Sequence, residues 1–217
     1  MTHYPLLLAS GQSGPSLYFG NASHSTTNTS SFSFSSMDFN VDNPLRLIIV
    51  AVHWYKFDTA ASINSITVGG VTPTLVTSSL RLVSGGSGSY IYSSIYSVQP
   101  SGSSGTISVQ FNNTATYGCS VATWAAYDLS STTPVDTSAG NPSRTVTTQV
   151  GDVVVGAMTA VYDGAAATWS GVNLDYTNES SRMTRTGGSI IAPTAGSLVV
   201  DANSTGTTET MCVAVWR

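Results

Sequence analysis

Charged residues are scarce in this chain of 217 residues, where they make up 8% of positions against roughly 25% in an average soluble protein. There are 7 Lys and Arg against 11 Asp and Glu, which gives a formal net charge of −4. Proteins that bind nucleic acid neutralise phosphates with cationic side chains, so we expect no nucleic-acid partner. The shortage of ionisable groups also leaves few candidates for acid–base chemistry.

Cysteine and long apolar runs are also scarce. The two cysteines, Cys119 and Cys212, exclude a disulfide framework and a zinc site, and the sequence leaves open whether they pair or remain two buried free thiols. The longest apolar run, Leu47 to Val52, is far shorter than the roughly 20 residues that span a bilayer, so we expect no membrane partner. The apolar stretch Leu6 to Ala9 is short and follows no Lys or Arg, so we expect no signal peptide.

Helix-forming residues are few, whereas Ser and Thr supply 64 of the 217 positions and Gly another 20. Short runs of Val, Ile, Thr, Tyr and Phe alternate with clusters of Gly, Ser, Asn and Pro, which is typical of strands and turns. The clearest strands are Arg46 to Phe57 and the alternating segment Thr106 to Phe111. No internal repeat is evident. The pattern predicts an all-β protein with an antiparallel, jelly-roll-like β-sandwich of roughly twelve strands.

The domain organisation follows from a change in composition near residue 40. Residues 1–40 are rich in Ser, Thr, Asn and Gly, and we interpret them as an N-terminal arm or edge strand. Residues 41–217 carry the regular strand pattern without a linker, so we expect one β-sandwich domain there and a single globular domain overall. The segment Thr2 to Asn40 is the candidate anchor for a partner, because an unpaired arm gains order on binding.

The usual catalytic motifs are missing. The clusters Gly85 to Gly88 and Gly102 to Gly105 do not have the G-x-S-x-G spacing of a nucleophile elbow. His53 lies in an apolar strand, and no pair of carboxylates can be singled out for glycoside hydrolysis. Asp38 to Asp42 has alternating oxygen ligands but lacks the Gly and Glu of a calcium loop, which favours a turn. We therefore expect no enzymatic activity, no catalytic residue, no cofactor and no metal.

Aromatic residues are the remaining candidates for a site. Tyr90, Tyr92 and Tyr96 share one face of a predicted strand, and Trp169 lies between polar residues. Exposed aromatic rings stack on the apolar faces of sugars, and they also pack against neighbouring subunits. Glycan contact, subunit contact and ordinary surface packing all remain open for these four residues.

Several segments, read in order, resemble a known group of proteins. They are Asn43 to Val52, the turn Thr67 to Gly70 within Ile66 to Val76, Gly118 to Ala122, the TTPVDT loop within Leu129 to Thr137, and Val213 to Arg217. Their order resembles a β-sandwich family of tailed phages, prophages and gene transfer particles, whose members are head decorations, head fibres and tail fibre or spike modules. The resemblance covers roughly residues 31–217. Its motifs are those of strands and turns, and it brings no catalytic residues.

The resemblance implies a structural virion protein, made in the bacterial cytoplasm, that decorates the surface of a phage-like particle. Its partners would be the major capsid protein or other virion proteins, and we expect a homo-oligomer such as a trimer. The alternative is a carbohydrate-binding or receptor-binding adhesin module that recognises host surface glycans through Tyr90, Tyr92, Tyr96 or Trp169. An aromatic row open to solvent favours the glycan hypothesis, whereas a row buried in a subunit contact favours assembly.

Overall fold

The computed structural model describes residues 14–56, 61–83, 88–112, 116–161, 167–180, 183–204 and 208–217. Every regular element in these residues is a β-strand, and all their pairings are antiparallel. The strands are β1 (Ser16–Thr29), β2 (Ser31–Asp38), β3 (Leu47–Lys56), β4 (Ile63–Val68), β5 (Thr74–Leu82), β6 (Tyr90–Val98), β7 (Ser104–Phe111), β8 (Thr116–Tyr127), β9 (Asp136–Gly140), β10 (Ser143–Thr148), β11 (Val153–Val161), β12 (Thr168–Ser170), β13 (Asn173–Ser180), β14 (Met183–Ile191), β15 (Gly196–Asn203) and β16 (Thr208–Trp216). The predicted all-β antiparallel sandwich is confirmed, with sixteen described strands in place of about twelve. No helix of these residues is long and apolar enough to cross a membrane.

The strands form two five-stranded and two three-stranded sheets. Sheet A has the order β1-β8-β3-β6-β5, and sheet B has the order β2-β7-β4. Sheet C has the order β9-β16-β11-β14-β13, and sheet D has the order β10-β15-β12. Adding eight to each strand number of sheets A and B gives sheets C and D, so the chain contains the same arrangement twice.

Each half has the strand order of a jelly roll, in which strands 1, 8, 3 and 6 face strands 2, 7 and 4. The fifth strand lies at the edge of the larger sheet. We call β1 to β8 unit 1 and β9 to β16 unit 2. The repeat escaped detection in the sequence because the two units share a strand arrangement but few residues at corresponding positions.

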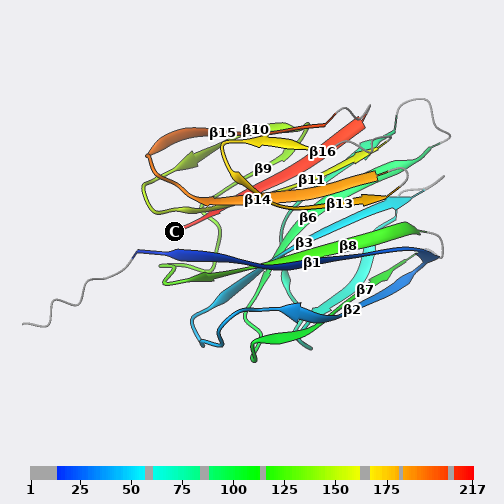
Figure 1. Ribbon diagram of the computed structural model, residues 1–217, viewed down its shortest axis with the longest axis horizontal. Helices are drawn as coiled ribbons and strands as arrows, with labels where there is room; N and C mark the ends of the chain where they lie inside the picture. The colour runs from blue at the N-terminus through cyan, green and yellow to red at the C-terminus, as the bar shows by residue number, and fades with distance from the viewer. Residues whose placement is uncertain are drawn as a thin grey trace, which may run out of the picture.

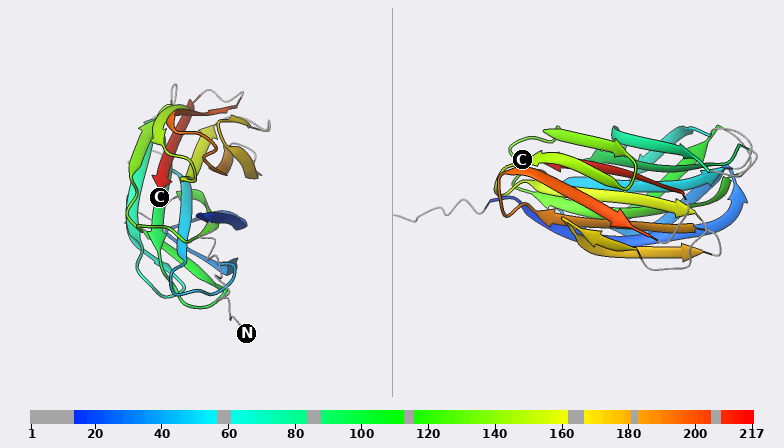
Figure 2. Two further views of the ribbon diagram at one scale, coloured as in Figure 1. Left: turned by 90° about the vertical axis from the view of Figure 1, so that its left-hand side faces the viewer. Right: turned by 90° about the horizontal axis from the view of Figure 1, so that it is seen from above.

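The four sheets are stacked in the order B, A, C, D, and three apolar layers lie between them (Figure 1). The layer between B and A contains Phe32, Phe39 and Ile107, and the layer between C and D contains Met158 and Val200. Figure 2 shows the strands of unit 2 lying together on one side of those of unit 1. Each unit therefore has a core of its own in addition to the layer that the two units share.

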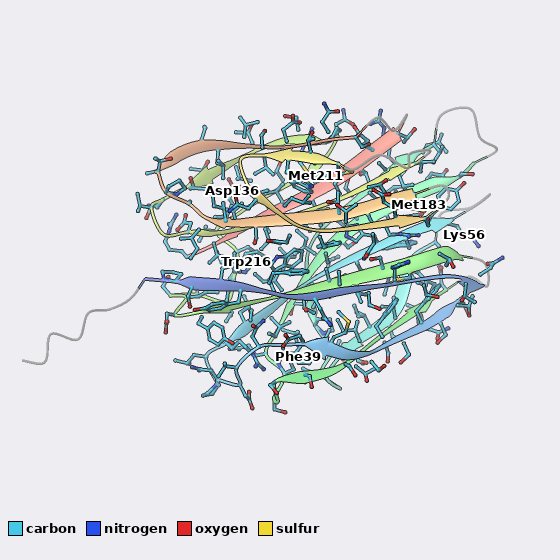
Figure 3. All side chains as sticks on the ribbon, viewed as in Figure 1. Phe39, Lys56, Asp136, Met183, Met211 and Trp216 are labelled. Carbon is cyan, nitrogen blue, oxygen red and sulfur yellow. The ribbon has the colours of Figure 1, made fainter. Side chains whose placement is uncertain are left out.

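The shared layer joins sheets A and C face to face and contains the fully buried Trp124 and Trp216. Figure 3 labels Trp216 between the two units and Phe39 within unit 1. β3 contacts β11, while β1 lies against β13 and β5 lies against β9. The units are thus related by an approximate twofold axis near β3 and β11. His53 on β3 hydrogen-bonds Thr159 on β11, 106 residues later, where the two corresponding strands meet.

The segment before residue 40 is an integral part of unit 1. β1 pairs with β8, and β2 pairs with β7, each at the edge of its sheet. The interpretation of residues 16–38 as an unpaired arm is therefore wrong, whereas that of an edge strand agrees with their position. The part of the candidate anchor at residues 1–13 lies outside the described residues.

Candidate functional site

Sheet A has two more strands than the sheet B that covers it, and its β5 edge carries an exposed apolar surface. Three leucines on β5 are about half exposed: Leu75 is 51% exposed, Leu80 is 53% exposed and Leu82 is 52% exposed. Leu80 pairs with Tyr92 and Leu75 pairs with Tyr96 across the β5–β6 ladder, so these side chains share one face of the sheet.

A pocket of about 250 Å³ opens beside this edge, and we call it the aromatic groove. Its walls come from the end of β3, the segment that leads into the start of β4, and the neighbouring strands β5 and β6. The lining residues are Trp54, Ala61, Ser62, Ile63, Leu75, Ser78, Ser79, Leu80, Tyr92, Ser94 and Tyr96. The groove therefore combines aromatic rings, aliphatic side chains and serine hydroxyls.

The aromatic wall is held in place by stacking and by one hydrogen bond. The rings of Trp54 and Tyr92 are parallel within 8°, with their centroids 4.4 Å apart. The backbone N–H of Ala61 donates to the Tyr92 hydroxyl at 2.9 Å, which ties the start of β4 to β6. These contacts give the groove a preformed wall.

Trp54 also carries a polar group that is left without a partner. The residue is 4% exposed, and its Nε1–H is buried and makes no hydrogen bond within the described structure. A buried donor without a partner costs about 1–3 kcal/mol. Trp54 therefore lines the groove and carries an unsatisfied hydrogen-bond donor.

The groove is electrically neutral. Burial raises the pKa of Tyr92 and, together with the neighbouring Cys119, raises the pKa of Tyr96 to about 12, so both phenols keep their protons at neutral pH. None of the described lining residues is an acid, a lysine or an arginine. The chemistry of the walls suits an uncharged ligand with hydroxyl groups.

The four predicted site residues lie in two places. Tyr92 and Tyr96 line the aromatic groove but are only 6% and 7% exposed, so the aromatic row is not open to solvent as the glycan hypothesis expects. Tyr90 lies beside Tyr92 with the ring centroids 6.5 Å apart. Trp169 is in unit 2, where its Nε1–H donates to Thr186 at 3.0 Å and its ring packs over Gly156. A Cβ on Gly156 would come within 2.8 Å of that ring. The Trp169 ring of sheet D therefore packs directly on the backbone of sheet C.

The sequence interpretation did not assign Trp54, Ser78 or Ser94 to the site. Trp54 pairs directly with Tyr92 across the β3–β6 ladder, a register that no local pattern in either strand reveals. Ser78 pairs with Ser94 in the same way. These residues could be assigned to the site only from the pairing register of β3, β5 and β6, which the sequence does not show.

The other candidates have structural partners. Asp38 accepts the backbone N–H of Asn40 in a local turn, and Asp42 accepts the backbone N–H of Gly102 from a distant loop. Within the described residues, no group of three or more His, Cys, Asp or Glu side chains is placed to hold a metal ion. Cys119 and Cys212 are both free and buried, and burial raises the pKa of each thiol to about 12.

Comparison with known protein families, curated proteins and solved structures finds no match to this chain.

Proposed function

We propose that this protein is a non-enzymatic carbohydrate-binding protein that holds a neutral sugar ring in the aromatic groove of unit 1. The unpartnered Nε1–H of Trp54 carries the proposal, because a sugar hydroxyl or ring oxygen is the acceptor that it lacks. The apolar face of the ring would pack against Tyr92, Tyr96 and Leu80, and the serine hydroxyls would bond to its polar edge. The volume of about 250 Å³ suits a single ring.

The setting we propose for this activity is the surface of a phage-type particle. The support is the resemblance of residues 31–217 to virion surface modules, together with a polar surface made of hydroxyls and a single lysine, Lys56, which leaves trypsin few sites. A glycan-binding module there would attach the particle to polysaccharide on a bacterial host.

A second candidate function is structural: the chain would decorate the particle by packing its β5 edge against the capsid or a neighbouring copy. The exposed Leu75, Leu80 and Leu82 favour it, because apolar side chains along an edge strand are a common subunit contact. The two functions share part of this surface, since Leu75 and Leu80 also line the groove, whereas Leu82 does not.

Binding of simple sugars tests the first proposal. We expect at least one methyl glycoside of glucose, galactose, mannose or N-acetylglucosamine to bind the full chain in calorimetric titration. Trp54→Phe keeps an aromatic ring but removes the N–H, so it should weaken that binding by about tenfold. Trp169→Phe is the matched control, because the same change is made outside the groove, and it should leave the affinity unchanged.

Two results would count against the groove. One is a complete absence of binding across the four glycosides by the wild-type chain. The other is equal affinity of Trp54→Phe and wild type for a sugar that does bind. Both variants should give the wild-type circular dichroism spectrum, so that a change in affinity is not a change in folding.

A further inference from the structure

A second cavity of about 440 Å³ lies in unit 1 where β1 begins and β8 ends, and we call it the terminal cavity. Its lining residues are Ser16, Tyr18, Asn40, Val41, Asn43, Tyr127 and Asp128. β1 and β5 are opposite edges of sheet A, so none of these residues belongs to the aromatic groove. The chain end marked C in Figure 1 lies at the same end of the molecule as the start of β1.

Asn40 lines this cavity and carries a buried side-chain donor without a partner. Its side-chain Nδ2 is buried and makes no hydrogen bond within the described residues. The backbone at Asn40 has a φ of 58°, in the left-handed region that few residues other than Gly enter. The side chain is therefore held in the cavity wall at the cost of an unsatisfied amide.

Asp128 stands on the cavity wall with the same backbone geometry, also with a φ of 58°. It is exposed, so its carboxylate is available to accept hydrogen bonds from a ligand. Asn43 uses its Oδ1 to accept the backbone N–H of Leu45 at 2.8 Å, which leaves its amide N–H groups as donors. The cavity thus offers amide donors and a carboxylate acceptor.

A buried arginine supports the loop that carries Asn40 and Val41. Arg46 is 1% exposed, and its Nη1 donates to the carbonyls of Asn40 and Val41 at 3.2 and 2.9 Å. Its Nη2 donates to the carbonyls of Pro100 and Gly102 at 2.8 and 2.9 Å. The Arg46 guanidinium therefore holds the backbone of Asn40 and Val41 in place. Arg46 is not among the residues that line the cavity.

Two tyrosines supply an aromatic platform. Tyr18 is 54% exposed, and its ring meets the edge of Tyr127 with the centroids 5.9 Å apart and an interplanar angle of 74°. The Tyr127 hydroxyl donates to the carbonyl of Val41 at 2.7 Å, which fixes that ring to the loop. The exposed ring of Tyr18 can stack on a ligand, and the edge contact with Tyr127 fixes the orientation of the Tyr18 ring.

We propose that the terminal cavity is a second binding site, which takes a neutral pyranose ring. A sugar ring would stack on Tyr18, accept hydrogen bonds from the amides of Asn40 and Asn43, and donate hydroxyl protons to Asp128. An anionic ligand would be repelled by the Asp128 carboxylate. A quaternary ammonium would suit the tyrosines and the carboxylate but would leave the Asn40 amide without an acceptor.

Saturation-transfer NMR on the full chain tests this site with the methyl glycosides of glucose, galactose, mannose and rhamnose, and with choline as the amine probe. We expect a glycoside signal that Tyr18→Ala removes. Asn40→Gly keeps a residue that accepts the left-handed backbone and deletes the amide, so it should weaken glycoside binding by about tenfold. Asp128→Asn should weaken it by a similar factor. Glu179→Gln, which neutralises an exposed carboxylate in unit 2, is the matched control and should have no effect.

The result distinguishes this cavity from the aromatic groove. Binding that survives Trp54→Phe but is lost in Asn40→Gly belongs to the terminal cavity, and the reverse pattern belongs to the groove. Our inference is overturned if no glycoside signal depends on Asn40 and Asp128, or if choline is the only probe whose signal Tyr18→Ala removes.

Discussion

His53 is a titratable residue enclosed at the contact between the two units. Its Nδ1 lies 2.8 Å from the Thr159 hydroxyl and 3.2 Å from that of Ser93, and its Nε2 lies 2.6 Å from the Tyr176 hydroxyl. Burial and, to a smaller extent, the positive charge of Arg185 together lower the pKa of His53 from 6.5 to about 3. The imidazole is therefore neutral in the folded protein at every pH above about 3.

This buried imidazole makes the stability of the protein depend on pH. Between pH 6.5 and about 3 the unfolded chain binds a proton at His53 that the folded chain does not bind. The free energy of unfolding should therefore fall as the pH is lowered through this window, by up to about 1.4 kcal/mol per pH unit from His53 alone. Urea unfolding at pH 7, 6, 5 and 4 measures the slope.

Carboxylates titrate in the lower part of the same window, so a variant must isolate the histidine. The Arg217 guanidinium and the Gln149 amide outweigh the effect of burial and hold the pKa of Asp152 below its usual value, which adds to the loss at low pH. His53→Gln keeps a donor and an acceptor but does not titrate. Its slope between pH 6.5 and 5 should be flatter than that of wild type, and equal slopes would exclude His53 as the source.

Individual residues show how far the candidate sites could be predicted. Tyr92 and Tyr96 were named from their spacing on one strand, and both line the aromatic groove. Trp54 is adjacent to Tyr92 only through the β3–β6 register. The terminal cavity draws on the start of β1, the loop after β2 and the end of β8, and no sequence pattern joins segments so far apart.

At the scale of single elements, β5 is an edge strand that has a register shift between Leu75 and Thr77 but little charge. Natural edge strands commonly carry charges or bulges that prevent pairing with another chain. The only charged residue of β5 is Arg81, and its Nη1 donates to the carbonyl of Glu209 in unit 2, away from the leucines. The exposed side chains Leu75, Leu80 and Leu82 of β5 therefore have no charged neighbour on the same face of this strand that would oppose pairing with another copy of the chain.

We therefore expect the protein to self-associate through β5 in a concentration-dependent way. Leu82→Lys places a charge on this edge outside the groove, so it should shift the equilibrium to the monomer and leave glycoside binding unchanged. Sedimentation velocity over a hundredfold range of concentration measures the shift. Leu174→Lys, on the edge strand β13 of unit 2, is the matched control, because Leu174 is exposed to a similar degree. A wild-type monomer at all concentrations would contradict the prediction.

The strands themselves were predicted with uneven success. The apolar run of β3 and the alternation of β7 gave clear signals, and both strands are present. Ser16–Thr29 is rich in Ser, Thr and Asn, yet it forms β1 because β8 supplies its hydrogen-bond partners. The segment from Ala167 to Tyr176 contains two strands, since Gly171 has a φ of 82° and turns the chain between β12 and β13.

At the scale of the whole molecule, the two units share the order of strands and the alternation of inward-facing apolar residues, but few identical residues. Leu47, Ile49 and Ala51 of β3 face the shared layer, as do Val153, Val155 and Ala157 at the corresponding positions of β11. The next inward position is His53 in one unit and Thr159 in the other. A jelly roll needs alternation and turns, which many residues satisfy, so two units can diverge until a comparison of residues no longer reveals them.

The shared layer makes the two units dependent on each other. Trp124 of unit 1 and Trp216 of unit 2 are fully buried there, and separation of the units would expose both together with the alanines and valines around them. A contiguous apolar face of this kind is poorly tolerated in water. Hydrogen bonds reinforce the contact: Trp124 Nε1 donates to Asp175 at 2.6 Å, and the Asn178 amide donates to Ser120 at 3.0 Å.

The connection between the units, residues 128–135, should therefore be dispensable once the protein has folded. A protease site inserted between Thr133 and Pro134 cuts the chain between β8 and β9, and the two fragments should remain together through a size-exclusion column, because the shared layer holds them. Calorimetry of the uncut chain should give one unfolding transition for both units, since neither keeps its buried face when the other unfolds. The uncut insertion variant is the control for the effect of the inserted residues. Separate elution of the fragments, or two resolved transitions, would mean that each jelly roll is stable alone and that the buried tryptophans contribute less to cohesion than their burial implies.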